Sequence, residues 1–178
     1  MKLNDSIPTE TPNQTTPPTI TPKPRTPKPP LEYKIVALRE SPLPEHMSWG
    51  DTPEKLVDYW RGFIEKNPYH NPDAECFVVV MLNTRRKIKG HHVVTHGTKD
   101  TLLVSPAEAF RAAVIANAAA VVLMHNHPSG EASPSEADIK VTRDMIRAGQ
   151  LLKVEVLDHV IIGRGQFQSL RTLGHFYS

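Results

Sequence analysis

The distribution of apolar residues along the chain predicts alternating strands and helices. Apolar runs bounded by turn residues predict strands over Glu75–Asn83, Ile88–His96, Ala118–His125 and Lys153–Ile162. Apolar positions at helical spacing after cap signals predict helices from Asp51 to about Lys66, from Ser105 to about Asn117 and from Ser133 to about Gln150. A further early strand is predicted over Leu31–Arg39. This alternation favours an α/β fold, a three-layer α/β/α sandwich with a mixed sheet.

The first thirty residues have a different composition from the rest of the chain. They hold nine of the seventeen prolines, many threonines and almost no large apolar side chain. Such a segment cannot bury enough surface to offset its ordering entropy, so residues 1–30 are predicted to be a disordered Pro/Thr-rich tail. Its stretch from Thr21 to Pro30 is expected to sample polyproline II, as a spacer or a docking arm. Residues 31–178 are predicted to form one domain with a sizeable core.

The sequence His125-Asn126-His127, followed eleven residues later by Asp138, is the strongest chemical signal. The two histidines end an apolar strand, and side chains two residues apart on a strand share a face. Two neutral imidazoles and one carboxylate suit a catalytic zinc site, which has three protein ligands and keeps a fourth position for water. The sequence therefore predicts one Zn²⁺ per chain, bound by His125, His127 and Asp138.

The segment after the histidines predicts how the aspartate reaches them. Pro128-Ser129-Gly130 is a turn signal. Ser133 is expected to be the helix N-cap, with Pro134 first in the helix and Glu136 as capping-box partner. Ser135 and Asp138 would then be neighbours on one helix face. Taken singly, a serine or an aspartate here is explained by capping or by the helix dipole, but the combination favours a metal site.

These residues resemble a known family. The pattern His-x-His-Pro-x6-Ser-x2-Asp is similar to the JAMM (MPN-plus) motif of metal-dependent isopeptidases, and the string His-Asn-His-Pro-Ser-Gly resembles its RadC-like bacterial branch. The similarity extends from about Tyr33 to Leu173 and includes the segments Leu82–Arg85, Ala107–Arg111, Asn117–Leu123 and Leu157–Ile162. It implies a fold of the JAMM and cytidine-deaminase kind and a zinc metallopeptidase that cleaves a peptide or isopeptide amide bond.

The resemblance also implies two catalytic residues. JAMM enzymes use a glutamate on an earlier strand as general acid/base, and Glu75 matches it at the head of an apolar strand. Ser135 is expected to hydrogen-bond the developing oxyanion beside the metal. Asn126 stands where many JAMM peptidases carry serine or threonine, whereas RadC-like proteins commonly carry asparagine. This difference argues against a eukaryotic-style deubiquitinase, not against the metal site.

Charge gives no support for a nucleic-acid partner. The tail carries four basic and two acidic residues, so its net charge of +2 equals that of the whole chain, and residues 31–178 balance to zero. The cluster Arg85-Arg86-Lys87 is interpreted as a solvated hairpin turn. RadC-like proteins carry a historical DNA-repair label, and longer members have a helix-hairpin-helix region that this sequence does not display. The expected partner is a peptide or protein substrate, while the oligomeric state cannot be read from the sequence.

The cysteine count and hydropathy bound the location of the protein. The single cysteine, Cys76, excludes an internal disulfide framework and is interpreted as a buried core residue. The sequence shows no 18-residue apolar run and no charged-then-apolar leader. It therefore predicts no membrane span and a bacterial cytoplasmic location.

Alternatives from other classes remain. A nucleoside or base deaminase needs a pair of cysteine ligands that one cysteine cannot supply. A non-catalytic metal-containing binding module, in a DNA-associated or protein-interaction role, would keep the same ligands without turnover. Asp158-His159 in the last strand is interpreted as structural, with a contact to the metal site as the alternative. The favoured function is a zinc-dependent hydrolase of the JAMM type.

Overall fold

The computed structural model describes residues 43–96 and 104–176. Within them the chain forms an α/β fold around a five-stranded mixed sheet, which confirms the predicted fold class. The strand predicted over Leu31–Arg39 and the tail boundary at residue 30 lie outside the described residues and stay predictions.

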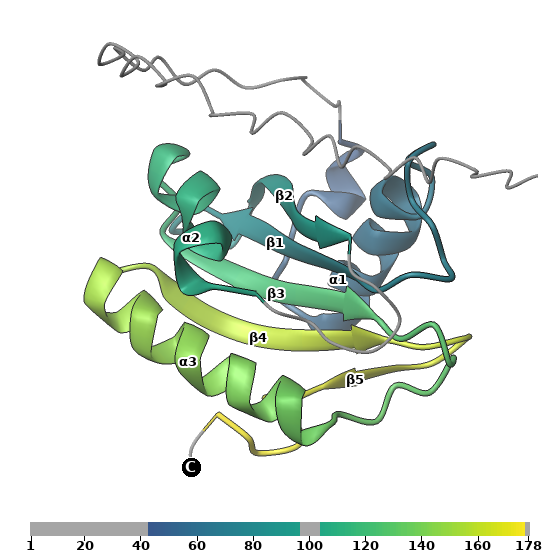
Figure 1. Cartoon of the computed structure of the whole chain (residues 1–178). Coiled ribbons are helices and arrows are strands. Elements are labelled where there is room, and N and C mark those ends of the chain that lie inside the picture. Colours follow the sequence, from purple (N-terminus) through teal and green to yellow (C-terminus); the bar gives the residue numbers. More distant parts are fainter. Residues whose placement is uncertain (1–42, 97–103, 177–178) are drawn as a thin grey trace, which may run out of the picture. The chain divides into compact units, whose positions relative to one another are not determined.

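The middle strand of the sheet, β3, carries His125 near its end (Figure 1). Its strands are β1 (Cys76–Leu82), β2 (Ile88–His96), β3 (Ala120–Asn126), β4 (Glu155–Ile162) and β5 (Phe167–Ser169). The spatial order is β2-β1-β3-β4-β5, in which β3 and β4 are parallel and every other pair is antiparallel. The four strands predicted within the described residues are present, including the β1–β2 hairpin, whereas the three-residue β5 was not predicted.

Helices cover both faces of the sheet, as a three-layer sandwich requires. They are α1 (Pro53–Tyr59), its π-helical continuation η2 (Trp60–Ile64), α2 (Pro106–Ile115) and α3 (Glu136–Leu152), with the short 3-10 turn η1 (Glu45–Met47) before them. Alternate residues of β1 point to opposite faces. Val78 and Val80 pack in the cluster that contains α1 and η2, while Phe77 and Val79 pack in the cluster that contains α2 and α3.

The start of α3 differs from the prediction. Ser135, not Ser133, is the N-cap, and its capping-box partner is Asp138 rather than Glu136. The sequence offers two overlapping capping boxes two residues apart, and local rules do not choose between them. Ala132 packs in a buried cluster with Ile161 and Leu170, so the chain just before α3 is held against the sheet as a loop. The predicted helix therefore begins two residues later, and it ends at Leu152 rather than Gln150.

An extra residue in β4 changes which side chains face α3. Val121 pairs with Val156, but Val122 pairs with Asp158, so Leu157 is an additional residue between these pairs. After this bulge the alternation of faces shifts by one position. His159 consequently pairs with Leu123 and shares the α3 face of the sheet.

Cys76 is buried in β1, as predicted, and burial raises the pKa of its thiol to about 11. Among the described helices, none combines the length and the apolar character needed to cross a membrane.

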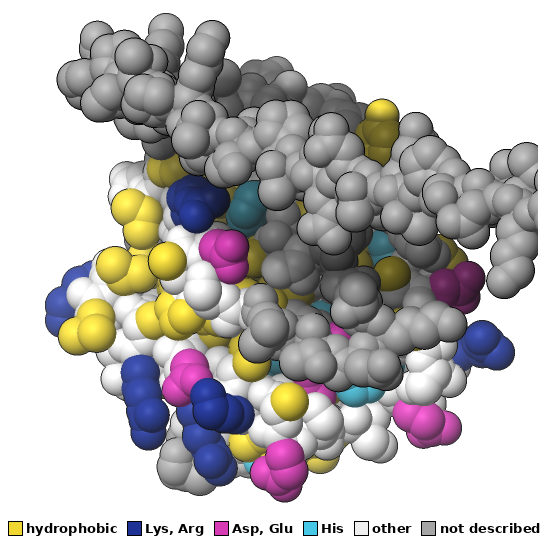
Figure 2. Space-filling model, viewed as in Figure 1, with side chains coloured by type: hydrophobic (Ala, Val, Ile, Leu, Met, Phe, Trp, Pro, Cys, Tyr) yellow, Lys and Arg dark blue, Asp and Glu magenta, His cyan; other side chains and the backbone are white. Residues whose placement is uncertain are grey.

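Apolar side chains are exposed where α2 and α3 end. They are Val114, Ile115, Leu151 and Leu152, of which Leu151 is the most exposed. In Figure 2 apolar side chains gather on the side of the molecule where these two helix ends lie in Figure 1. This surface is at the opposite end of β3 from the histidine pair.

Candidate metal centre

The three predicted metal ligands meet at the end of β3. His125 and His127 lie on the face covered by α3, and Asp138 lies in the first turn of that helix. His125 Nε2 is 3.0 Å from His127 Nε2 and 3.1 Å from Asp138 Oδ1, and His127 Nε2 is 3.5 Å from Asp138 Oδ2. Ligands bound to one tetrahedral zinc stand about 3.3 Å apart, so these separations suit a shared cation.

The distant ring nitrogens of both histidines are already engaged. His127 Nδ1 lies 2.8 Å from the carbonyl oxygen of Glu131, and a carbonyl can only accept, so this nitrogen carries the proton. His125 Nδ1 lies 2.8 Å from His159 Nε2. Only the Nε2 atoms are left for the centre, and two nitrogen lone pairs at 3.0 Å repel unless a cation lies between them. The donor set therefore fits a metal ion.

The charges of the centre support cation binding. Burial alone would raise the pKa of Asp138, but the adjoining imidazoles of His125 and His127 hold it well below its ordinary value. The hydrogen bond with Asp138 raises the pKa of His127, burial opposes this rise, and the nearby charge of Glu75 adds to it. The carboxylate is thus ionised in a buried place, where it favours any cation placed beside it.

The candidate centre is buried at His125 and Asp138 and partly exposed at His127. The His125 side chain is fully buried, whereas 14% of the His127 side chain is exposed. In the turn after His127, the Gly130 carbonyl accepts hydrogen bonds from Arg164 N at 2.8 Å and from the Gln166 side chain at 3.0 Å. These bonds fix the loop whose Glu131 carbonyl orients His127.

Ser135 lies beside the centre, and its hydroxyl is already hydrogen-bonded to Asp138. Its Oγ is 2.6 Å from Asp138 Oδ2 and accepts the Asp138 backbone N–H at 3.2 Å. Since the carboxylate can only accept, the hydroxyl proton is directed at Asp138. The role of Ser135 toward an oxyanion stays a prediction, and it requires this hydroxyl to turn away from Asp138.

Glu75 directly precedes β1, opposite the end of β3. The last β1–β3 pair is Phe77 with His125, and continuing this antiparallel register places Glu75 across from His127. Glu75 lies near enough for its charge to act on His127. The structure therefore brings together all five predicted site residues, while the catalytic assignments of Glu75 and Ser135 remain untested.

Asn126, between the two histidines, faces the opposite side of β3 and holds the backbone around Glu75. Its side-chain oxygen accepts the Cys76 N–H at 2.9 Å, and its amide donates to the Ala74 carbonyl at 3.1 Å. These two bonds continue the β1–β3 ladder with a side chain in place of backbone. The residues on both sides of Glu75 are thereby tied to the histidine-bearing strand.

Replacing Asn126 with alanine is expected to destabilise this junction. The Cys76 N–H and Ala74 carbonyl would lose their partners in a largely buried place, at a cost of about 1–3 kcal/mol in the free energy of unfolding. Urea denaturation of the two proteins measures the difference. Asn71→Ala is the matched control, because Asn71 also accepts a backbone N–H but is exposed, and it should change stability by less than about 0.5 kcal/mol. Equal losses of stability in both variants would contradict the proposed contribution of the two Asn126 hydrogen bonds.

His159 and Thr142 were not among the predicted site residues. His159 contacts His125, as described, and its Nδ1 lies 2.6 Å from Thr142 Oγ1. The alternative interpretation of His159, a contact with the metal site, is the one that the structure bears out. Asp158 has the structural role, since its carboxylate accepts Ser169 Oγ at 2.6 Å and Arg171 N at 3.1 Å.

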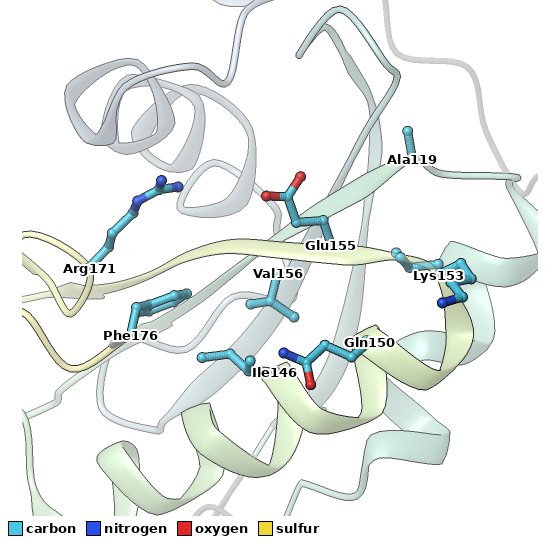
Figure 3. A pocket seen from close by; sticks show the side chains of 10 residues that line it. Ala119, Ile146, Gln150, Lys153, Glu155, Val156, Arg171 and Phe176 are labelled. Carbon is cyan, nitrogen blue, oxygen red and sulfur yellow. The ribbon is translucent and has the colours of Figure 1, made fainter. Parts of the chain in front are cut away.

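A separate pocket of about 440 Å³ lies between the end of α3 and the start of β4. Its lining combines apolar side chains with Lys153, Glu155 and Arg171 (Figure 3). It is at the opposite end of β3 and β4 from His125, and none of the predicted site residues lines it.

The sequence profile of the RadC-like JAB domain matches residues 51–175, a span that includes both sides of the sheet and every residue of the centre. The chain belongs to the RadC-like JAB domain family. Relatives include UPF0758 proteins of Thermosynechococcus vestitus, 48% identical over 100 residues, and Chloroflexus aggregans, 47% identical over 102 residues. A UPF0758 protein of Methanosarcina barkeri is 43% identical over 100 residues.

These alignments cover part of each protein. They include 56–57% of this chain but only 40% of the Thermosynechococcus protein and 44% of the other two. This RadC-like JAB domain chain therefore matches less than half the length of these curated relatives. Their names state no activity, substrate or metal.

Proposed function

We propose that this RadC-like JAB domain is a zinc-dependent hydrolase that cleaves a peptide or isopeptide amide bond. The observation that carries the proposal is the convergence of His125 Nε2, His127 Nε2 and Asp138 Oδ1 next to Glu75, at a place where the His127 side chain is partly exposed. Such a set of two imidazoles and a carboxylate with a free position is typical of catalytic zinc sites.

Each of the five residues has a role in this proposal. His125, His127 and Asp138 would hold the ion. A bound Zn²⁺ would lower the pKa of a water molecule to near neutral pH and would place a positive charge beside the substrate carbonyl. Glu75 accepts a proton from the attacking water and returns it to the leaving nitrogen. Ser135 donates its hydroxyl to the oxygen on which negative charge develops.

The proposal is tested by metal content and amide cleavage measured on the same preparation. We expect about one zinc per chain by elemental analysis. A mixed library of peptides and lysine-linked isopeptides should yield new amino termini or free lysine amines, and a chelator should stop their release. Zinc without cleavage would favour the non-catalytic binding module. A chain that takes up no divalent ion even when zinc is supplied would overturn the hydrolase.

A further inference from the structure

A chain of buried polar groups runs behind the metal centre from one ligand to another. It starts at His125 Nδ1, passes through both ring nitrogens of His159 to Thr142 Oγ1, and ends at the backbone carbonyl of Asp138, with successive distances of 2.8, 2.6 and 2.6 Å. His125 and Thr142 are fully buried, and His159 is 1% exposed. Water therefore does not compete for these bonds.

The backbone carbonyl at the end of this series determines which atom donates in each of its hydrogen bonds. The Asp138 carbonyl can only accept, so it takes the one hydroxyl proton of Thr142. Thr142 Oγ1 must then accept from His159, which places a proton on His159 Nδ1. A second proton on His159 would create a buried positive charge that none of the described carboxylates contacts, which is unfavourable. His159 Nε2 therefore carries no proton and accepts a hydrogen bond from His125 Nδ1–H.

The two histidine ligands are thus oriented by different kinds of partner. His127 Nδ1 faces a carbonyl, which leaves no choice of direction. His125 Nδ1 faces another imidazole, which can either donate or accept. If His159 donated, His125 would carry its proton on Nε2, pointing into the centre and blocking cation binding there. A third group must therefore determine which imidazole donates in the His125–His159 bond. Thr142 can do so because it contacts His159.

We propose that His159 and Thr142 are positioning residues that hold His125 in the Nδ1–H form, so that its Nε2 lone pair faces the cation. The inference rests on the metal centre of the proposed function but not on turnover. It assigns no catalytic step to either residue, since neither contacts the ligand position. Partners of this kind typically contribute 10–100-fold to metal affinity.

The test compares Thr142→Val with Thr142→Ser in the full chain. Both variants keep a small side chain on α3, but only serine keeps the hydroxyl. Nitrogen-15 NMR of the metal-free protein, at about pH 8.5 where free imidazoles are neutral, identifies which ring nitrogen of His125 and His159 carries the proton. Zinc affinity is measured by competition with a chelator of known affinity.

We expect wild type and Thr142→Ser to show both rings protonated at Nδ1. Thr142→Val should show Nε2–H forms of His159 and His125 and bind zinc about 10–100-fold more weakly. An Nε2–H ring at His125 in the wild type would overturn the inference. So would a valine variant whose ring forms and zinc affinity match those of the serine variant.

If Thr142→Val does not fold, a second pair of variants, at His159, tests the same inference. In His159→Gln the amide oxygen can accept from His125 and the amide nitrogen can donate to Thr142, whereas His159→Leu can do neither. Retained affinity in the glutamine variant and loss in the leucine variant are expected, and equal affinities would overturn the inference. Absence of zinc binding in wild type would remove the proposed function, while the ring forms of the metal-free chain still decide this inference.

Discussion

Asp138→Ala is expected to abolish stoichiometric metal binding and, with it, all metal-dependent cleavage. The variant removes the only carboxylate among the three converging ligands, at a position where its pKa is held low by two imidazoles. The loss of zinc affinity should exceed the roughly 100-fold that follows from losing a partner of a ligand. Chelator competition and elemental analysis measure it.

The same variant should also loosen the start of α3. Asp138 closes the capping box with Ser135, and loss of such a cap costs about 0.5–2 kcal/mol in the free energy of unfolding. Glu136→Ala is the matched control, because it removes an acidic side chain from the same helical turn, where it is exposed. Zinc retained at one per chain in Asp138→Ala would show that the ion binds elsewhere.

Glu75→Gln is expected to separate metal binding from catalysis. The substitution preserves the size of the side chain but removes its ability to take a proton, which should lower kcat by about 10²–10⁴-fold. Zinc content should stay near that of wild type, since Glu75 is outside the three ligands that converge at the end of β3. The measurement pairs elemental analysis with the initial rate of amide cleavage.

Asp73→Asn provides the control for Glu75. It neutralises a carboxyl group two residues earlier in the same loop, but this residue is exposed. A general effect of charge before β1 would slow both variants equally, and the proposed role of Glu75 would then fail. Full activity in Glu75→Gln would also exclude it as the base.

The convergence of the three candidate metal ligands could be predicted from the sequence because their geometry is mostly local. His125 and His127 are two residues apart on one strand, and Asp138 is one turn and one helix start away. Glu75 is fifty residues before the first of them and was found only through the family resemblance. The strand register that brings it opposite His127 is a long-range property, which no local pattern in the sequence displays.

The arrangement behind the ligands could not be predicted for a related reason. Simple alternation from Val156 would place Asp158, not His159, on the α3 face, and the extra residue Leu157 reverses this. A bulge of one residue leaves no clear signal in an apolar run. The start of α3 was misplaced because two capping boxes overlap, and the packing of Ala132 decides between them.

The cap at α3 also limits how Asp138 can bind an ion. Its Oδ2 atom receives the Ser135 N–H at 2.7 Å and the Ser135 hydroxyl at 2.6 Å, whereas Oδ1 faces His125. Bidentate coordination would compete with the bonds that hold the helix start, so a monodentate carboxylate is favoured. Three single-atom ligands leave a low coordination number, which suits a tetrahedral ion and disfavours calcium, whose shell needs six to eight oxygens. In the proposed metal centre, the helix cap would thus contribute to metal selectivity.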